Sequence, residues 1–235
     1  MNNIEKTSKK KKIITALILG GILLLLAAGE ITYFIVKNNS HDENEEEIDS
    51  TIMWKKPIIY LYPEEQMEIS IKLGKKENLT CSYPKYEDGW DVIANPDGTL
   101  LDLNTGRKLY SLYWEGIQSN GTSFEDGFVV KGNETIEFLE EKLAILGLNE
   151  YEAEEFIVYW LPELQNNEYN LIRFATIEEI NEVMPLIFSK EPDTLIRVLM
   201  QFKALDKYEE VKEQKLEQKE RKGFTVVEWG GEEIK

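Results

Sequence analysis

Two glutamates in this chain lie beside tryptophans in short motifs that end in glycine. Glu115 follows Trp114, and Glu228 precedes Trp229. Two carboxylates about 5–10 Å apart can serve as acid and base, or as nucleophile, in glycoside hydrolysis, where aromatic rings hold the sugar. Glu115 and Glu228 are therefore candidate catalytic residues of a glycan- or cell-wall-active hydrolase. Trp114, Trp229 and Trp90 are the candidate ligand-binding residues.

The same motifs also have a purely structural interpretation. The chain has 44 acidic residues among 235, so a glutamate falls beside a tryptophan easily by chance. Both glutamates then lie at the rim of strands whose tryptophans pack the core, since aromatic side chains supply much of the interior of a mid-sized domain. We expect most of the five Trp and eleven Tyr in the core. Trp54 and Trp90 flank turns and are expected nearer the surface.

Other reactive sets are weaker. Cys81 is the only cysteine and His41 the only histidine, so neither an internal disulfide nor a nearby Cys–His pair is available, and we expect Cys81 to be buried on a strand. Asp97, Asp102 and Asn104 hint at a calcium loop, but their spacing departs from the helix–loop–helix pattern and turn chemistry explains them better. The sequence has no glycine-rich nucleotide loop and no zinc-ligand spacing. We expect no metal and no cofactor.

The charge of the chain is strongly acidic and unevenly distributed. The net charge is -17, but residues 1–36 hold five Lys and two Glu, which leaves 22 basic and 42 acidic residues in the remainder. Such a domain repels the phosphates of nucleic acid, so a nucleic-acid partner is excluded. Solubility alone is the other explanation of the charge.

Residues 13–36 form an apolar run interrupted only by Glu30, long enough for a helix that crosses a membrane. Four lysines precede it at 9–12 and an acidic stretch follows it. The positive-inside rule predicts a cytoplasmic tail at 1–12, a transmembrane helix at 13–36 and everything after it outside the cell membrane. A cleavable signal peptide with its cleavage site at 27–29 is the alternative. Residues 37–52 are predicted to be a solvated acidic linker.

From residue 53 the pattern is first strand-like and then helical. Apolar runs and strict alternation predict strands at 57–63, 67–73, 79–83, 90–94, 99–102, 110–115 and 127–131. Apolar spacing predicts a helix from Glu134 to Leu146, capped by Asn133 and stopped by Gly147. A second helix begins at Asn149 with a capping box and is predicted to end before Pro162.

The remainder is again mostly strand. Strands are predicted at 171–175, 184–189 and 194–205, with a helical turn at 177–182. Residues 207–222 form a charged run, either a solvated helix or an extended arm. Residues 223–231 form a strand expected to return to the main sheet. The 53–235 domain is thus predicted to be α+β, with a mostly antiparallel sheet and a central helical hairpin.

Several segments together resemble an uncharacterised bacterial family of membrane-anchored proteins. The segments are KPIIYLYP at 56–63, GWDVIANPDGTL at 89–100, LYWEG at 112–116, NEYEAEEFIVYWLP at 149–162, EPDTLIRV at 191–198 and GFTVVEWGG at 223–231. The resemblance spans almost the whole outer domain and implies that it is one unit, including the last strand. It implies no function.

These observations predict a single-pass, membrane-tethered outer domain. It is expected to bind an envelope glycan or protein without catalysing a reaction, and residues 13–36 are its contact with the membrane. The hydrolase with Glu115 and Glu228 is the alternative. A third hypothesis is an accessory subunit whose helix docks on another membrane protein.

Overall fold

The computed structural model describes residues 52–118 and 125–234. The predicted tail at 1–12, the predicted transmembrane helix at 13–36 and all but the last residue of the predicted linker lie outside these residues. Across the described ranges, none of the helices combines the length and the apolar character needed to cross a membrane.

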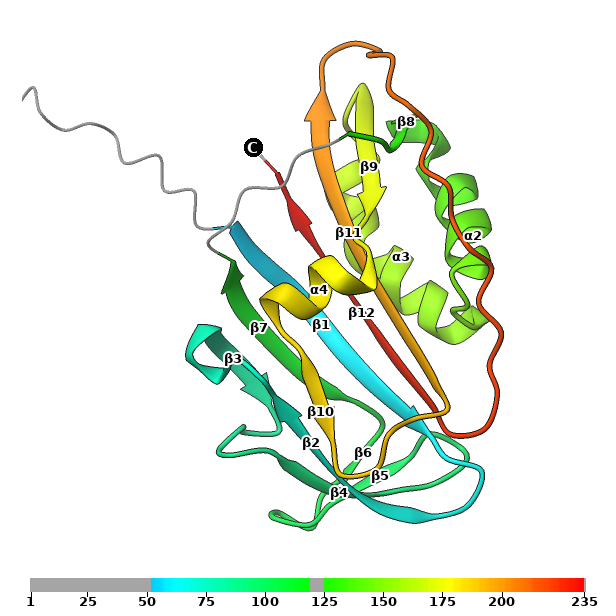
Figure 1. Ribbon diagram of the computed structural model, residues 1–235. Coiled ribbons are helices and arrows are strands. Elements are labelled where there is room, and N and C mark those ends of the chain that lie inside the picture. The colour runs from blue at the N-terminus through cyan, green and yellow to red at the C-terminus, as the bar shows by residue number, and fades with distance from the viewer. Residues whose placement is uncertain (1–51, 119–124, 235) are drawn as a thin grey trace, which may run out of the picture. The chain divides into compact units, whose positions relative to one another are not determined.

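The described chain forms an α+β unit with two sheets and three α-helices (Figure 1). The larger sheet has seven strands, all antiparallel to their neighbours except the parallel pair β11 and β12. Its strands in spatial order are β3 (Leu79–Tyr83), β7 (Leu112–Gln118), β1 (Ile52–Tyr62), β12 (Thr225–Glu233), β11 (Thr194–Leu205), β9 (Tyr169–Phe174) and β8 (Phe128–Lys131). The predicted α+β class with mostly antiparallel pairing is confirmed.

The smaller sheet has five strands and covers one face of the larger sheet. In spatial order these strands are β10 (Leu186–Phe188), β2 (Met67–Leu73), β4 (Trp90–Ala94), β5 (Leu100–Asp102) and β6 (Lys108–Leu109). The strict alternation in β2 buries Ile69, Ile71 and Leu73 against the larger sheet, while Ser70 is half-buried and Lys72 is exposed. The segments predicted at 184–189 and 194–205 therefore belong to different sheets.

The opposite face of the larger sheet packs against two helices, α2 (Thr135–Ile145) and α3 (Glu150–Leu164). Asn149 and Glu152 form the predicted capping box at the start of α3. Two details of the prediction are wrong. Asn133 does not cap α2, whose N-cap is Glu134. Helix α3 also continues through Pro162, because its fully buried Leu164 adds apolar contacts to the core that favour a further turn.

A third helix, α4 (Ile177–Val183), lies on the side of the smaller sheet and leads into β10 (Figure 1). Short 3₁₀ turns at Lys76–Asn78 and Gly132–Glu134 complete the structure. The charged run at 207–222 is an extended arm and not a helix. The Gln214 side chain donates to the backbone oxygen of Phe174 and accepts from its backbone nitrogen. The backbone of Gly127 donates to the oxygen of Lys212 and accepts from the nitrogen of Gln214.

The arm delivers the chain to β12, which lies between β1 and β11. The predicted return of the last strand to the main sheet is confirmed. Two glycines make its position possible. A Cβ at Gly231 would lie 2.6 Å from the Trp160 ring, and a Cβ at Gly230 would lie 3.0 Å from the backbone of Pro57. Both faces of this strand are therefore packed too closely for a side chain at these two positions.

Candidate functional site

The two Glu–Trp motifs lie near each other in the sheet but with opposite orientation. Ile59 is the neighbour of both Glu228 and Leu112, which puts Glu228 on the same face as Leu112 and Trp114. Side chains alternate between faces along a strand. Glu115 therefore points to the other face, where Trp229 packs against the helices. The fold does not bring the two carboxylates into one cleft.

Glu228 lies between the two sheets in a closed polar cluster. Its carboxylate accepts hydrogen bonds from Trp114 Nε1 at 2.8 Å and from Arg197 Nε at 2.5 Å. Arg197 also donates to Asn181 Oδ1 at 2.6 Å and to the backbone oxygen of Met184 at 2.9 Å. The Glu228 side chain is only 5% exposed and that of Arg197 is 0% exposed. A buried carboxylate with these donors has no access to a substrate.

A second polar cluster extends along the same face toward α4. Arg173 donates to Gln201 at 2.8 Å and to Glu179 at 2.8 Å, and Gln201 donates to Glu232 at 2.6 Å. Burial by itself would raise the pKa of Glu179, but hydrogen bonds from Arg173 and Thr176 outweigh burial and hold the pKa below its ordinary value of 4.5. This cluster fixes α4 to the sheet.

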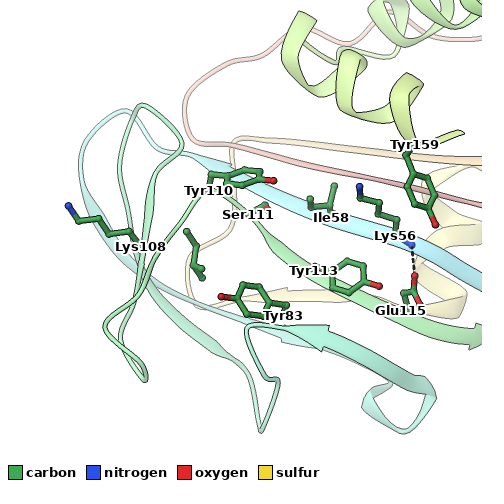
Figure 2. A pocket seen from close by; sticks show the side chains of 10 residues that line it. Lys56, Ile58, Tyr83, Lys108, Tyr110, Ser111, Tyr113, Glu115 and Tyr159 are labelled. Carbon is green, nitrogen blue, oxygen red and sulfur yellow. Dashed lines mark hydrogen bonds between the residues drawn. The ribbon is translucent and has the colours of Figure 1, made fainter. Parts of the chain in front are cut away.

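Glu115 instead lines an open groove on the helix-covered face of the larger sheet (Figure 2). The groove has a volume of about 580 Å³, which is within the range of ~300–1,000 Å³ common for ligand sites. It lies between α3 and the strands at the β3 end of the sheet. Its lining is rich in tyrosine and consists of Lys56, Ile58, Tyr83, Lys108, Leu109, Tyr110, Ser111, Tyr113, Glu115 and Tyr159.

Lys56 lines this groove from a strained position of the backbone. Its φ of 55° lies in the left-handed region, in a bulge where β1 has an extra residue relative to both β7 and β12. Its backbone nitrogen donates to Glu115 Oε1 at 3.3 Å. The ammonium points away from that carboxylate (Figure 2) and lies 4.6 Å from the ring centre of Tyr159 and 5.7 Å from that of Trp229. Within the described residues no carboxylate forms an ion pair with it.

The four tyrosines of the groove come from separate elements of the fold. Tyr110 and Tyr83 are 58% and 52% exposed, so their rings are open to a ligand. Burial, and then a hydrogen bond to Glu115, raise the pKa of Tyr113, and burial also raises the pKa of Tyr159 and Tyr110. These three phenols keep their protons at neutral pH and remain hydrogen-bond donors.

Tyr60 supports the groove from below. Its ring centre lies 6.4 Å from that of Tyr110. Its hydroxyl donates to Glu155 of α3 and accepts a hydrogen bond from Trp229 Nε1 at 3.2 Å. Trp229, proposed from sequence as a ligand platform, is completely buried and acts through Tyr60 and Lys56.

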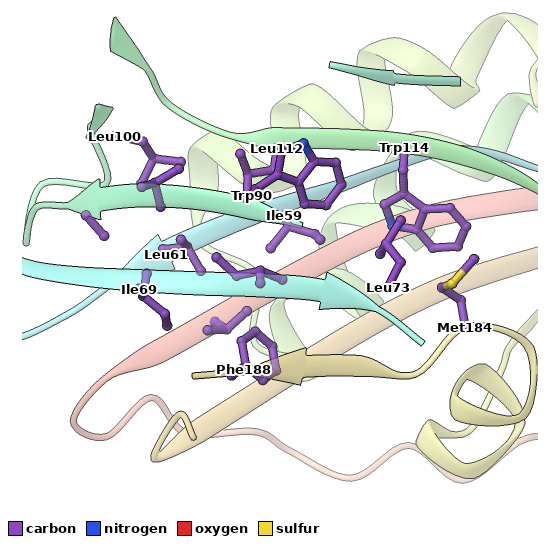
Figure 3. Close-up of a cluster of buried hydrophobic side chains, with 14 of the residues drawn as sticks. Ile59, Leu61, Ile69, Leu73, Trp90, Leu100, Leu112, Trp114, Met184 and Phe188 are labelled. Atoms are coloured by element: carbon purple, nitrogen blue, oxygen red, sulfur yellow. The ribbon is translucent and has the colours of Figure 1, made fainter. Parts of the chain in front are cut away.

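The other tryptophans selected from the sequence are also core residues. Trp114 and Trp90 are each 1% exposed and pack between the two sheets (Figure 3). Trp90 Nε1 donates to the backbone oxygen of Pro84 at 2.9 Å. The expectation that Trp54 and Trp90 lie near the surface is wrong, because the second sheet covers that face. Cys81, expected to be buried, is exposed on the edge strand β3.

The acidic residues near Gly98 and Gly106 take part in turns. Asp97 accepts from the backbone and hydroxyl of Thr99, and Asp102 accepts from Asn104 and Thr105. Over the ranges that the structure describes, no group of three or more metal-ligating side chains comes together.

Another hollow of about 620 Å³ lies between α2 and α3. It is lined by aliphatic and acidic residues such as Leu148, Ile157 and Glu154, and by no basic or aromatic side chain. The tyrosine groove offers more varied recognition groups, so we take it as the candidate site. Sequence inspection missed Lys56, Tyr110 and Tyr159; the available signal was the Lys-Pro pair opening an apolar strand.

A scan against protein-family models finds no match, and neither does a search of curated proteins or of solved structures.

Proposed function

We propose that this chain is a membrane-tethered, non-catalytic binding module of the cell envelope, and that the tyrosine groove is its ligand site. The observation that carries the proposal is the open groove, which combines the exposed rings of Tyr83 and Tyr110 with the Lys56 ammonium. Ligand sites combine apolar walls with a few polar groups that orient the ligand, and this groove has both.

The groove has the groups for binding but few for catalysis. Glu115 is the one carboxylate in its lining, whereas glycoside hydrolysis needs two. Ser111 has no histidine beside it in the lining to act as a base. The tether is the apolar run at 13–36, and the outside location follows from the lysines at 9–12.

The test is retention of the purified full-length chain, in mild detergent, on washed cell walls from the producing organism. The wild type should be retained. The double variant Tyr83→Ala/Tyr110→Ala should lose on the order of tenfold or more in affinity, because each exposed ring that stacks contributes about 1 kcal/mol. Tyr151→Ala is the matched control, since Tyr151 is 81% exposed and outside the groove.

Two outcomes count against the proposal. Wild-type protein that fails to bind, or that binds as well after loss of both groove tyrosines, would remove the groove as the ligand site. Release of soluble sugars by the wild type, measured in the same incubation, would show a catalytic activity and contradict the binding-only role.

A further inference from the structure

The one ammonium that faces the groove belongs to Lys56, because the Lys108 side chain, although part of the lining, extends away from it (Figure 2). The other polar groups of the lining are four phenol hydroxyls, one serine hydroxyl and the Glu115 carboxylate. That carboxylate is already engaged by the backbone N–H of Lys56 and by the Tyr113 hydroxyl. Hydroxyls can donate or accept, so the Lys56 ammonium is the group that favours a negatively charged acceptor oxygen on the ligand.

Lys56 marks where that charge belongs. Glycine would occupy a left-handed position without strain, whereas a residue with a Cβ costs more there. Backbone strain of this kind is commonly retained at ligand sites. The side chain directs its ammonium over two rings and toward no carboxylate of the described residues. An ammonium held in this way, partly shielded from water, is suited to a ligand anion.

The exposed rings add a second requirement. The ring centre of Tyr110 lies 6.4 Å from that of Tyr60, and the rings of Tyr110 and Tyr83 are each exposed to a ligand. A phosphate polymer would match Lys56 but has no ring to place against these tyrosines. A proline-rich peptide would match the rings but leave the Lys56 ammonium without a partner. A sugar ring carrying a carboxylate matches both features.

We propose that the groove binds an acidic glycan, with a sugar carboxylate on the Lys56 ammonium and sugar rings against Tyr110 and Tyr83. This inference rests on the proposed function and names its ligand class. The groove suits such a ligand better than the rest of the domain does, since it holds the Lys56 ammonium over aromatic rings, without a carboxylate partner among the described residues, on a chain of net charge -17. The acidic surface elsewhere repels a polyanion, so binding is confined to the groove.

Titration calorimetry on the full-length chain can test this with two matched probes: a hexamer of a uronic acid, and the same hexamer after reduction of its carboxyl groups. The acidic hexamer should bind more tightly, on the order of tenfold, because one charge-assisted hydrogen bond is involved. Lys56→Met should reduce its affinity to that of the neutral hexamer, and Lys56→Arg should restore most of it. Tyr110→Ala should weaken both hexamers.

Lys203→Met is the control, because Lys203 is exposed on β11 and outside the groove. Thermal melting of each variant identifies any that do not fold, and Lys56→Arg keeps the test decisive in that case. Equal affinity for the two hexamers, or tighter binding of an acidic proline-rich peptide, overturns the glycan assignment. Cell-wall retention that needs Tyr83 and Tyr110 but not the Lys56 charge also overturns it, while leaving the proposed function intact.

Discussion

The two Glu–Trp motifs lie on β7 and β12, which are separated by β1 in the larger sheet. The surroundings of their two glutamates differ in burial and in hydrogen bonding. Around Glu228 every polar group is engaged: Trp114 and Arg197 donate to the carboxylate, and α4 and the smaller sheet exclude water. Around Glu115 the polar groups face an open groove, and the Lys56 ammonium makes contact with rings rather than with a carboxylate. The polar groups of the first region join elements of the fold to one another, whereas the second region leaves an ammonium and exposed rings open to a groove.

The reversed order of the two residues produces this difference. Trp114 comes before its glutamate and Trp229 comes after it. Because strand side chains alternate between faces, the sheet places Trp114 with Glu228 on one face and Trp229 with Glu115 on the other. Each tryptophan thus lies on the same face as the glutamate of the other motif. Trp114 binds Glu228 directly, and Trp229 supports the groove through Tyr60.

The largest expected difference between the two regions is in stability. Glu228→Leu leaves Arg197 buried without its anion, so we expect a loss of about 3–5 kcal/mol in the free energy of unfolding. Glu115→Leu removes the 3.3 Å bond from the Lys56 backbone and the hydrogen bond from Tyr113 at a half-exposed site where water can replace both, with an expected loss of about 1 kcal/mol. Urea denaturation measures both. Equal losses of unfolding free energy would mean that Glu115 stabilises the fold as much as Glu228 does, and would contradict the comparison.

Replacing each of the two tryptophans by phenylalanine compares the two regions with the same change in side-chain volume. Trp114→Phe and Trp229→Phe remove the same atoms from sites that are 1% and 0% exposed. The first also removes a donor to a charged carboxylate, worth about 1.5–3 kcal/mol, and the second a donor to a neutral hydroxyl, worth about 0.5–1.5 kcal/mol. Trp114→Phe should therefore unfold at lower denaturant concentration. If Trp229→Phe unfolded at the lower denaturant concentration instead, the stronger hydrogen bond would be the one from Trp229 to Tyr60 beside the groove.

Strain should be confined to the groove. At Lys56, glycine should be more stable than alanine by about 1 kcal/mol, because a Cβ in the left-handed region is costly. At the neighbouring Lys55, which has no positive φ, alanine should be the more stable by a similar amount. Thermal melting of the four single variants compares the two positions. If the alanine variant melted at a higher temperature than the glycine variant at both positions, the backbone of Lys56 would not be strained.

The smallest effect concerns pH and the second polar cluster. The pKa of Glu179 is held below 4.5 in the folded chain, so its ionised form stabilises the fold above that pH, and the stabilisation is lost as pH falls through the lowered pKa. Glu179→Gln should be less stable than the wild type at pH 7, and the difference should shrink as the pH falls below 4.5. In an Arg173→Met background the difference at pH 7 should be smaller, because only the hydrogen bonds from Thr176 then remain. A difference that does not shrink below pH 4.5 would require another cause.

Local signals in the sequence determined most of the elements. Strict alternation predicted β2 residue for residue, the capping box fixed the start of α3, and the apolar end of the chain predicted a strand that joins the main sheet. These features depend on neighbours within a few residues, through side-chain direction and through hydrogen bonds at a helix end. Asn133 failed as a cap because a 3₁₀ turn at Gly132–Glu134 precedes α2.

Only the tertiary structure decided the site. Whether Trp90 or Cys81 is buried depends on where the second sheet lies, and a strand pattern does not contain that information. The groove joins Lys56, Tyr110 and Tyr159, residues far apart in the chain that meet because α3 packs against β1 of the larger sheet. The partners of Glu115 and Glu228 likewise depend on strand register, which long-range pairing sets and which a shift of one residue would reverse.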